Sequence, residues 1–350
     1  KRQIEHPNNG SETGYVLTDG INTIPFIYQS IINCKDGEHF IVCRNSLYGI
    51  YSKDLRLIIP IDCKSITPIT NSQKCVGVRQ DNAICLIDLV DAAQQALPYE
   101  RLRLDDGNLI VSQQGKEGVI DANNKVIVPI AYQQCTAVAN KYLKVKTIRD
   151  NATADYGLYD YHGKQILQSR FSWIDYIGDD LFILKNENGK SALYNAACDR
   201  YVFGEKWFDG IKAYNNHTLF RLYENNKYAL ANLDGIILTP FKYDSMYFSY
   251  NGSIKVNVGE FVGTLSHNGQ EIYDDEITLR DGYIATSFFG KWNVMHDGKE
   301  CLPRIYNAIK SLADDWVEVS QNGLWGISNL NGESVLPIEY TSIILYEAVS

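Results

Sequence analysis

The sequence lacks the signatures that would place it in a membrane or at a familiar active site. It has no run of about 18 apolar residues, so no segment is long enough to cross a membrane as a helix. It has no G-x-x-x-x-G-K-[ST] loop, no G-x-G-x-x-G fingerprint and no G-x-S-x-G elbow. No signal peptide is visible, although a chain that begins at Lys1 is compatible with a preceding targeting segment. These absences favour a non-catalytic protein.

Positive charge is scarce. The chain has 33 Lys and Arg against 42 Asp and Glu, which gives a net charge of −9. Nucleic-acid binding depends on Lys and Arg side chains that neutralise phosphates, so this balance argues against nucleic acid as the partner. The hydrophobic share of 45% is that of a packed protein rather than a disordered one.

The cysteines show no pairing pattern. None of the eight forms a C-x-x-C pair, and no Cys/His set has zinc-finger spacing, so we expect no metal or other cofactor. We expect them to be buried small hydrophobes, which mildly favours a reducing, cytoplasmic compartment. They are Cys34, Cys43, Cys63, Cys75, Cys85, Cys135, Cys198 and Cys301.

What the sequence does contain is an internal repeat, clearest at residues 323–343. Its pattern is an aromatic-glycine pair, an apolar strand, an Asn-Gly turn, an apolar-proline pair and then Tyr-x-x-Ile. The period is close to 35 residues, and seven of the nine prolines fall in one position of the unit. We therefore predict a flexible lead-in over 1–12 and one repeat domain over 13–350. Its ten units start near the glycine slots at 14, 49, 83, 118, 157, 192, 229, 263, 293 and 326, with Ala83 in the slot of the third.

Each unit reads as four short strands. Asn-Gly and Asp-Gly favour two-residue hairpin turns, so strand one (326–330) should turn back on strand two (334–336). Proline then ends strand two or lies on a sheet edge. Strand three carries Tyr340 and Ile343, and strand four alternates apolar and polar residues, as in 316–319. Residues 88–103 are the one helix candidate, which we interpret as an irregular repeat.

One such unit is too small to bury its own apolar face, so neighbouring units must stack. Stacking predicts that one isoleucine position of the repeat lies in a continuous core. Its members are Ile31, Ile66, Ile174, Ile211, Ile309 and Ile343.

The unit resembles the bacterial WG repeat, also called the KWG repeat. The similarity is closest at Leu324-Trp325-Gly326-Ile327 with Leu336-Pro337, and it is good at Lys291-Trp292-Asn293-Val294. Weaker copies extend from Gly14 to Ile343. The resemblance implies a β-repeat module that mediates contacts, and it implies no catalytic residues. Only two copies keep the tryptophan, which fits a packing role for that position.

The predicted fold class is all-β, built from tandem four-stranded repeats. Four strands per unit match a propeller blade, although 35 residues is lean for one. We expect a propeller-like ring, and an open superhelical β-array is the alternative.

Several polar clusters are more simply explained by turns. His162, His267 and His296 lie in or beside equivalent hairpin turns. Acidic pairs recur just before strand four, and they spell no calcium-binding loop. These pairs are Asp105-Asp106, Asp179-Asp180 and Asp314-Asp315.

Aromatic side chains outside the repeat positions are the candidate binding residues, because exposed Tyr and Trp suit protein interfaces and also stack on sugar faces. The segment 147–155 makes the longest spacing, and such insertions often mark a binding face. The candidates are Trp173, Tyr176, Trp207, Tyr214, Tyr247 and Tyr250.

The leading hypothesis is a non-catalytic scaffold that binds a protein or peptide. A carbohydrate-binding repeat protein and a regulatory domain of a larger multidomain protein are the alternatives.

Overall fold

The computed structural model of the chain is all-β. Its described part contains no α-helix, only the short 3-10 turn Arg280–Gly282, and thus no helix that could span a membrane. The chain divides into two compact units, residues 1–174 and 175–350, and each is described by itself. The structure describes residues 2–5, 13–16, 28–34, 36–149, 153–214, 217–249, 252–259, 261–312 and 315–344.

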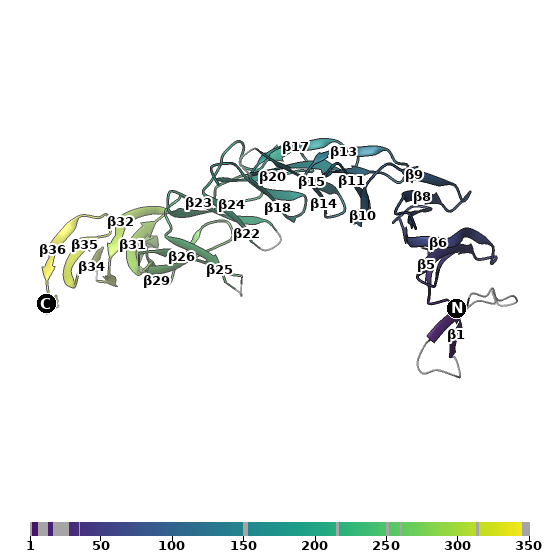
Figure 1. Cartoon of the computed structure of the whole chain (residues 1–350). Helices are drawn as coiled ribbons and strands as arrows, with labels where there is room; N and C mark the ends of the chain where they lie inside the picture. The colour runs from purple at the N-terminus through teal and green to yellow at the C-terminus, as the bar shows by residue number, and fades with distance from the viewer. Residues whose placement is uncertain are drawn as a thin grey trace. The chain divides into compact units, whose positions relative to one another are not determined.

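The first unit is a succession of antiparallel strands (Figure 1). They are β1 (Arg2–Glu5), β2 (Thr13–Val16), β3 (Ser30–Asn33), β4 (His39–Arg44), β5 (Leu47–Ser52), β6 (Leu57–Pro68), β7 (Lys74–Arg79), β8 (Ile84–Asp88), β9 (Gln94–Leu97), β10 (Arg101–Asp105), β11 (Asn108–Gln113), β12 (Lys116–Ile120), β13 (Val126–Tyr132), β14 (Gln134–Val138), β15 (Tyr142–Ile148), β16 (Ala154–Asp160) and β17 (Gln165–Phe171).

The second unit continues the same pattern, and the division falls just inside its first strand. Its strands are β18 (Trp173–Gly178), β19 (Leu181–Lys185), β20 (Ser191–Asn195), β21 (Arg200–Tyr201), β22 (Gly210–Tyr214), β23 (Leu219–Glu224), β24 (Lys227–Asn232), β25 (Ser245–Phe248), β26 (Ile254–Val258), β27 (Phe261–Leu265), β28 (Glu271–Ile272), β29 (Asp275–Thr278), β30 (Ile284–Phe288), β31 (Lys291–His296), β32 (Lys299–Tyr306), β33 (Ala308–Ser311), β34 (Trp316–Gln321), β35 (Leu324–Asn329) and β36 (Ser334–Tyr340).

From β10 onward these strands form successive four-stranded sheets, except for the three-stranded sheet β22–β24. Strands β3–β9 form one seven-stranded sheet, and β1 and β2 form a pair. The frame of the four-stranded sheets is shifted by half a repeat from the sequence unit. The sheet β33–β36 contains strands three and four of the ninth copy, followed by strands one and two of the tenth. The sheets β10–β13, β14–β17 and β29–β32 have the same composition. In these sheets each sequence repeat contributes two strands to one sheet and two to the next, whereas in β3–β9 the long strand β6 pairs with both β5 and β7 and joins the two halves into one sheet. Such sheets fit both a propeller-like ring and an open array.

Two expectations about local structure need adjustment. The predicted lead-in 1–12 lies mostly outside the described residues, but Arg2–Glu5 within it form β1, which pairs with β2. Strand two runs on past the proline: β36 extends from Ser334 to Tyr340 and is the last, edge strand of its sheet. Proline is tolerated there because an edge strand leaves one row of backbone groups without ladder partners. The helix candidate 88–103 contains strand residues, which confirms its interpretation as an irregular repeat.

The glycine slot exists because strand two crosses strand one at very short range. A Cβ added at Gly118 would lie 2.7 Å from the carbonyl oxygen of Val128. A Cβ added at Gly49 would lie 2.7 Å from the carbonyl oxygen of Ile59, and one added at Gly326 would lie 2.7 Å from that of Leu336. The ladder between the two strands shifts register at this crossing, as expected for a β-bulge. At these three positions glycine is thus required because a side chain would overlap the backbone of strand two.

Copies without this glycine show how the requirement can be relaxed. In the third copy the slot belongs to Cys85 rather than Ala83, and the facing residue on β7 is Gly77. There β8 and β9 pair without a register shift. Where the slot holds Ala192 or Ala229, strand two is reduced to a two-residue strand or to isolated bridges. Asn293 differs from these residues: it fills the slot of the ninth copy, and β31 and β32 still shift register there.

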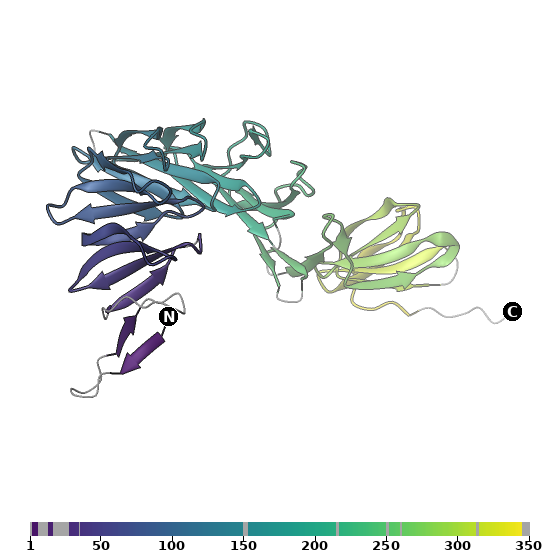
Figure 2. The same ribbon diagram turned by 90° about the vertical axis from the view of Figure 1, so that its right-hand side faces the viewer.

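Figure 2 shows the strands of successive sheets within each unit. The hydrophobic core lies between neighbouring sheets rather than within one. Leu302 of β32 belongs to one cluster with Val317 and Val319 of β34. The predicted isoleucine position is buried at four of its members: Ile31, Ile66, Ile174 and Ile309. Ile211 and Ile343 are only half-buried.

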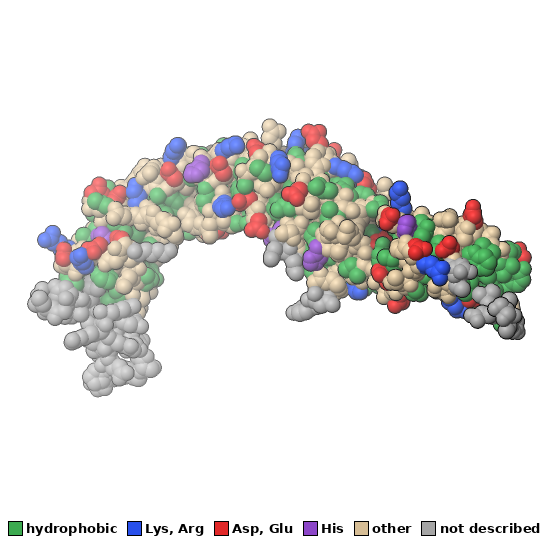
Figure 3. Space-filling model, turned by 180° about the vertical axis from the view of Figure 1, so that it is seen from behind, with side chains coloured by type: hydrophobic (Ala, Val, Ile, Leu, Met, Phe, Trp, Pro, Cys, Tyr) green, Lys and Arg blue, Asp and Glu red, His purple; other side chains and the backbone are tan. Residues whose placement is uncertain are grey.

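The face of β33–β36 that looks away from β29–β32 is apolar. Leu302 and Tyr306 of β32 are buried, at 0% and 8% exposure, whereas Tyr340, at the position equivalent to Tyr306, is 42% exposed. Val335 and Leu324 are also exposed. Figure 3 shows hydrophobic side chains gathered over this sheet. Inner sheets cover the equivalent positions with the next pair of strands.

We predict that Gly118→Ala lowers the free energy of unfolding by about 1–3 kcal/mol, because the methyl group overlaps backbone atoms of β13. The control is Gly210→Ala, whose Cβ would lie 3.6 Å from Cβ of Tyr223, an ordinary contact. It should change stability by no more than about 0.5 kcal/mol. Urea denaturation of both variants measures the difference. Equal effects would refute the steric explanation of the slot.

Candidate functional site

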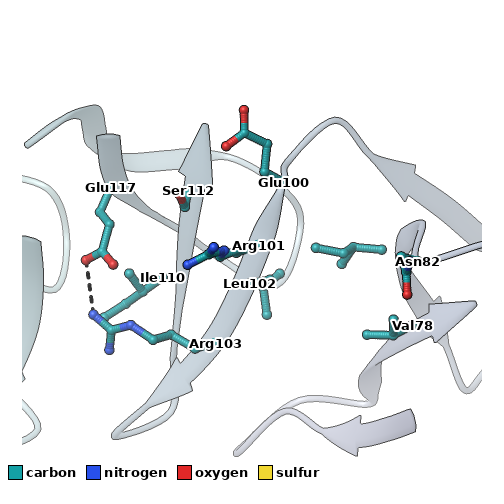
Figure 4. Close-up of a pocket in the computed structure, with 10 residues that line it drawn as sticks. Val78, Asn82, Glu100, Arg101, Leu102, Arg103, Ile110, Ser112 and Glu117 are labelled. Atoms are coloured by element: carbon teal, nitrogen blue, oxygen red, sulfur yellow. Dashed lines mark hydrogen bonds and ion pairs between the residues drawn. The ribbon is translucent and has the colours of Figure 1, made fainter. Parts of the chain in front are cut away.

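A groove of about 670 Å³ lies along β10 in the first unit. Strand β10 is the edge strand of its sheet, and the neighbouring strands β7 and β8 supply the opposite wall. Apolar side chains of Val78, Ile84, Leu102 and Ile110 line it together with polar ones (Figure 4). The polar side chains are Asn82, Glu100, Arg101, Arg103, Ser112 and Glu117.

Arg103 is held firmly at this groove. Its guanidinium lies 3.1 Å from the Glu117 carboxylate and 3.2 Å from that of Asp105. It also donates to the carbonyl oxygen of Cys135 in the next sheet, at 2.6 Å. Glu117 occupies the position that is tryptophan in the copy at Trp325, where Lys310 lies 3.9 Å from the ring centroid. In these two copies a strand-three cation lies beside this position, and it is received by a carboxylate in one and by an aromatic ring in the other.

Glu100 belongs to a second recurring element. Its Oε1 accepts a hydrogen bond of 3.0 Å from the backbone N–H of Gln114, which lies in the hairpin turn between strands four and one. The residue that follows the repeat tyrosine or phenylalanine makes this bond in several copies. The pairs are Gln29 with Ser46, Gln133 with Ile148, Asp209 with Asn225, Asp244 with Gly259 and Asn307 with Asn322.

Two of the carboxylates that accept these hydrogen bonds, those of Asp209 and Asp244, have a lowered pKa. The Lys190 ammonium, together with the N–H of Asn225, lowers the pKa of Asp209 below its ordinary value. Lys227 and the N–H of Gly259 lower the pKa of Asp244 in the same way. A lowered pKa means that these bonds contribute stability above the unfolded-state pKa and lose it as the pH falls through the folded-state pKa.

Arg101 differs from Arg103 in having no partner. Within the described residues its exposed guanidinium makes no hydrogen bond or ion pair. It pairs in register with Ser112, and Ser112 pairs with Glu117, so the three side chains form one row across the sheet. The groove therefore offers one uncommitted guanidinium beside an apolar floor.

The second unit has a groove at the same positions of the repeat. This groove, of about 300 Å³, lies along β22, again the edge strand of its sheet. Gly210, Tyr223 and Tyr228 form the row equivalent to Arg101, Ser112 and Glu117. Lys212 and Arg221 stand where Arg103 and Ile110 stand in the first unit. A groove that recurs at equivalent positions is a property of the repeat.

The structure does not gather the six aromatic candidates into one site. Trp173 is 46% exposed, and its ring packs edge-on against Tyr156 with Lys144 over its face. Tyr247 is also 46% exposed. Tyr250 lies outside the described residues. The other three are half-buried against rings: Tyr176 against Phe182, Trp207 against Tyr201 and Tyr214 against Phe248.

Other candidates take the positions expected of turn and core residues. Asp106, Asp179 and Asp180 adopt positive φ in hairpin turns, whereas Asp314 is outside the described part. His267 and His296 contact backbone carbonyl oxygens beside their turns. Six cysteines are buried and all eight are free, with Cys198 exposed and Cys301 half-buried. No group of three or more His, Cys, Asp or Glu side chains in the described residues could hold a metal ion.

Sequence reasoning missed the residues that line both grooves. Of these, Arg101, Ser112 and Lys212 sit on ordinary repeat strands, where the pattern predicts only a polar surface. Tyr228 holds the aromatic position of the repeat, for which the sequence predicts packing. A comparison of the copies position by position would have shown that charge and ring size vary along this row. The extension 147–155 is part of the β15–β16 hairpin, and its residues 150–152 are outside the described part.

We predict that Arg103→Ala lowers the free energy of unfolding by about 1–3 kcal/mol, because it leaves the half-buried Glu117 carboxylate without its counter-ion. Arg101→Ala, two residues away on the same strand, should change it by less than about 0.5 kcal/mol. Denaturant unfolding of the two variants provides the comparison. A large loss in the Arg101 variant would contradict the description of that side chain as uncommitted.

Comparison with known structures gives likenesses at low similarity. The extracellular domain of a putative hybrid two-component system from B. thetaiotaomicron matches with a TM-score of 0.28 and 9% identity over 91% of this chain, which spans 52% of that one. A eukaryotic initiation factor matches with a TM-score of 0.33 and 8% identity, covering 92% and 90%. BamB from Moraxella catarrhalis matches with a TM-score of 0.27 and 11% identity, over 83% of this chain and 93% of that one. No functional inference follows from likenesses at this level.

No curated protein matches the sequence. The family model described as "WG containing repeat" matches residues 118–147. That segment starts at the glycine slot Gly118 and runs through β13 and β14 into β15, so it contains strands one to four of one copy. The resemblance to the WG repeat is thereby confirmed over residues 118–147, which form one copy of the repeat.

Proposed function

We propose that the chain is a non-catalytic repeat scaffold that binds extended peptide or protein segments in the grooves along β10 and β22. The observation that carries the proposal is the recurrence of a groove at the same repeat positions in both units, each beside an edge strand. An edge strand leaves backbone N–H and C=O groups without partners in its own sheet. An extended peptide can pair with these groups while its side chains enter the groove.

The walls of the first groove suit such a ligand. Ile84 and Ile110 are buried at its floor, and Arg101 and Ser112 stand above them with free donors or acceptors. A peptide that binds mainly through its backbone needs little more than apolar contact and a few polar anchors. The proposed specificity therefore resides in the side chains of the row Arg101, Ser112 and Glu117.

Peptide binding in the first groove is tested with a substitution that introduces a residue already present at the equivalent position of the second unit. Tyr223 occupies the position of Ser112 in the second unit, so Ser112→Tyr should fold and fill the first groove. A displayed library of random linear peptides is panned on the full chain, with counter-selection against Ser112→Tyr. The surviving peptides should bind wild type and Ser112→Ala alike and bind Ser112→Tyr at least about tenfold more weakly, or ~1.4 kcal/mol.

If no peptide survives, or the survivors bind Ser112→Tyr as well as wild type, peptide binding in this groove is wrong. Thermal melting of the three proteins checks that a loss of binding does not come from unfolding. The library needs no knowledge of the natural partner.

Carbohydrate is the second candidate ligand. It is favoured by the exposed rings of Trp173 and Tyr247, since aromatic faces stack on sugar rings. Screening a glycan array with wild type and with the Trp173→Ala and Tyr247→Ala variants tests it. A bound glycan whose signal is lost in either variant supports this candidate, and silence across the array removes it.

A further inference from the structure

The two grooves occupy equivalent positions, but they differ in charge. In the groove along β10 the two arginines are balanced by Glu100 and Glu117. In the groove along β22 the charged lining residues are Lys212 and Arg221, and no carboxylate lines it. Such a groove is unusual for a chain with a net charge of −9.

The absence of a counter-ion has a direct cause in the repeat. Arg103, at the position equivalent to Lys212, is neutralised by Glu117 and Asp105. The residues at those two positions in the second unit are Tyr228 and Tyr214. An aromatic residue thus replaces each carboxylate, and within the described residues Lys212 has neither a hydrogen bond nor an ion pair.

Arg221 adds a second positive charge. It stands at the position of Ile110, donates to the carbonyl oxygen of Met246 in the next sheet and lies over the Tyr228 ring at 5.0 Å. A neutral carbonyl and a ring face hold the guanidinium in place without cancelling its charge. The arginine is therefore fixed by packing and remains available to an anion.

The carboxylates near this groove are committed elsewhere. Asp209 lies 2.9 Å from the Lys190 ammonium and also accepts the N–H of Asn225. Glu224 lies 3.4 Å from the ammonium of Lys206. Gly210, which has no side chain, leaves space in the row where Arg101 stands in the first unit.

We propose that the groove along β22 selects acidic peptide segments, with a ligand carboxylate placed at Lys212 and Arg221 and the apolar side chain two residues along the peptide against Tyr223 and Tyr228. This inference rests on the proposed function, since it names the ligand class of one groove. A carboxylate side chain supplies the missing counter-ion of Lys212, and ion-assisted hydrogen bonds of this kind are the stronger ones. The groove along β10, with balanced charges, has no such preference.

The probes are three labelled linear peptides with the repeat Thr-Val-Thr-X, where X is glutamate, glutamine or lysine, so that valine and X lie on the same face of an extended strand. Fluorescence anisotropy with the full chain at low salt should give the tightest binding for the glutamate peptide, by roughly tenfold over the glutamine peptide. Added salt should reduce the difference, because a partly exposed ion pair is screened. The lysine peptide should bind most weakly.

Variants locate the effect. Lys212→Ala should remove most of the preference for glutamate, and Lys212→Glu should reverse it. Tyr228→Glu introduces the residue found at the equivalent position of the first unit, so it should pair with Lys212 and also abolish the preference. Lys299→Ala, which removes an exposed lysine on β32, is the matched control and should leave binding unchanged.

The outcomes separate this inference from the proposed function. If the glutamine peptide binds as well as the glutamate peptide, or if Lys212→Ala leaves the preference intact, the acidic selectivity is wrong while peptide binding stands. If none of the peptides binds and the library selection also fails, both are wrong. Thermal melting excludes misfolded variants, and Lys212→Ala and Lys212→Glu, at an exposed site, provide two independent measurements.

Discussion

The whole structure depends on sheets that have apolar side chains on both faces. In β8 the four residues Ile84, Cys85, Leu86 and Ile87 are all buried, although successive side chains of a strand point to opposite faces. A sheet of this kind is stable only between two neighbours. The sequence repeat enforces this arrangement, because in the four-stranded sheets a copy supplies the last two strands of one sheet and the first two of the next. Neighbouring sheets are therefore joined by packing and also by the course of the chain.

Two positions on strand one have different roles in this scheme. The glycine slot is in close backbone contact with strand two. At Cys85 and Ala229 a larger residue is accompanied by a regular or broken strand two, whereas at Asn293 the register shift is kept. The preceding position, named for its tryptophan, varies between copies, and in two of them its side chain meets a cation of strand three. It is Glu117 against Arg103 in one copy and Trp325 against Lys310 in another. This second position sets the charge of the groove beside it.

Much of this architecture could be predicted from the sequence. The repeat period, the all-β class, the hairpin turns and four of the six core isoleucines follow from glycine and proline positions and from alternation. The half-repeat shift between the sequence unit and the sheet could not be predicted. The sequence of strand three does not tell whether it joins the sheet of the strands that precede it or the sheet of those that follow. Nor could the grooves be predicted. Each groove lies beside a row of side chains from three strands. The row begins with Arg101 and Ser112 in the first unit and with Gly210 and Tyr223 in the second, and no local motif marks it.

The account's central claim is that each sheet is stabilised by its neighbour. Amide hydrogen exchange of the full chain and of Val319→Ala, measured by mass spectrometry, tests it most directly. Val319 is 1% exposed and lies in the cluster between β29–β32 and β33–β36. The account predicts faster exchange in both sheets and unchanged exchange in β18–β21. Faster exchange confined to β33–β36 would contradict it.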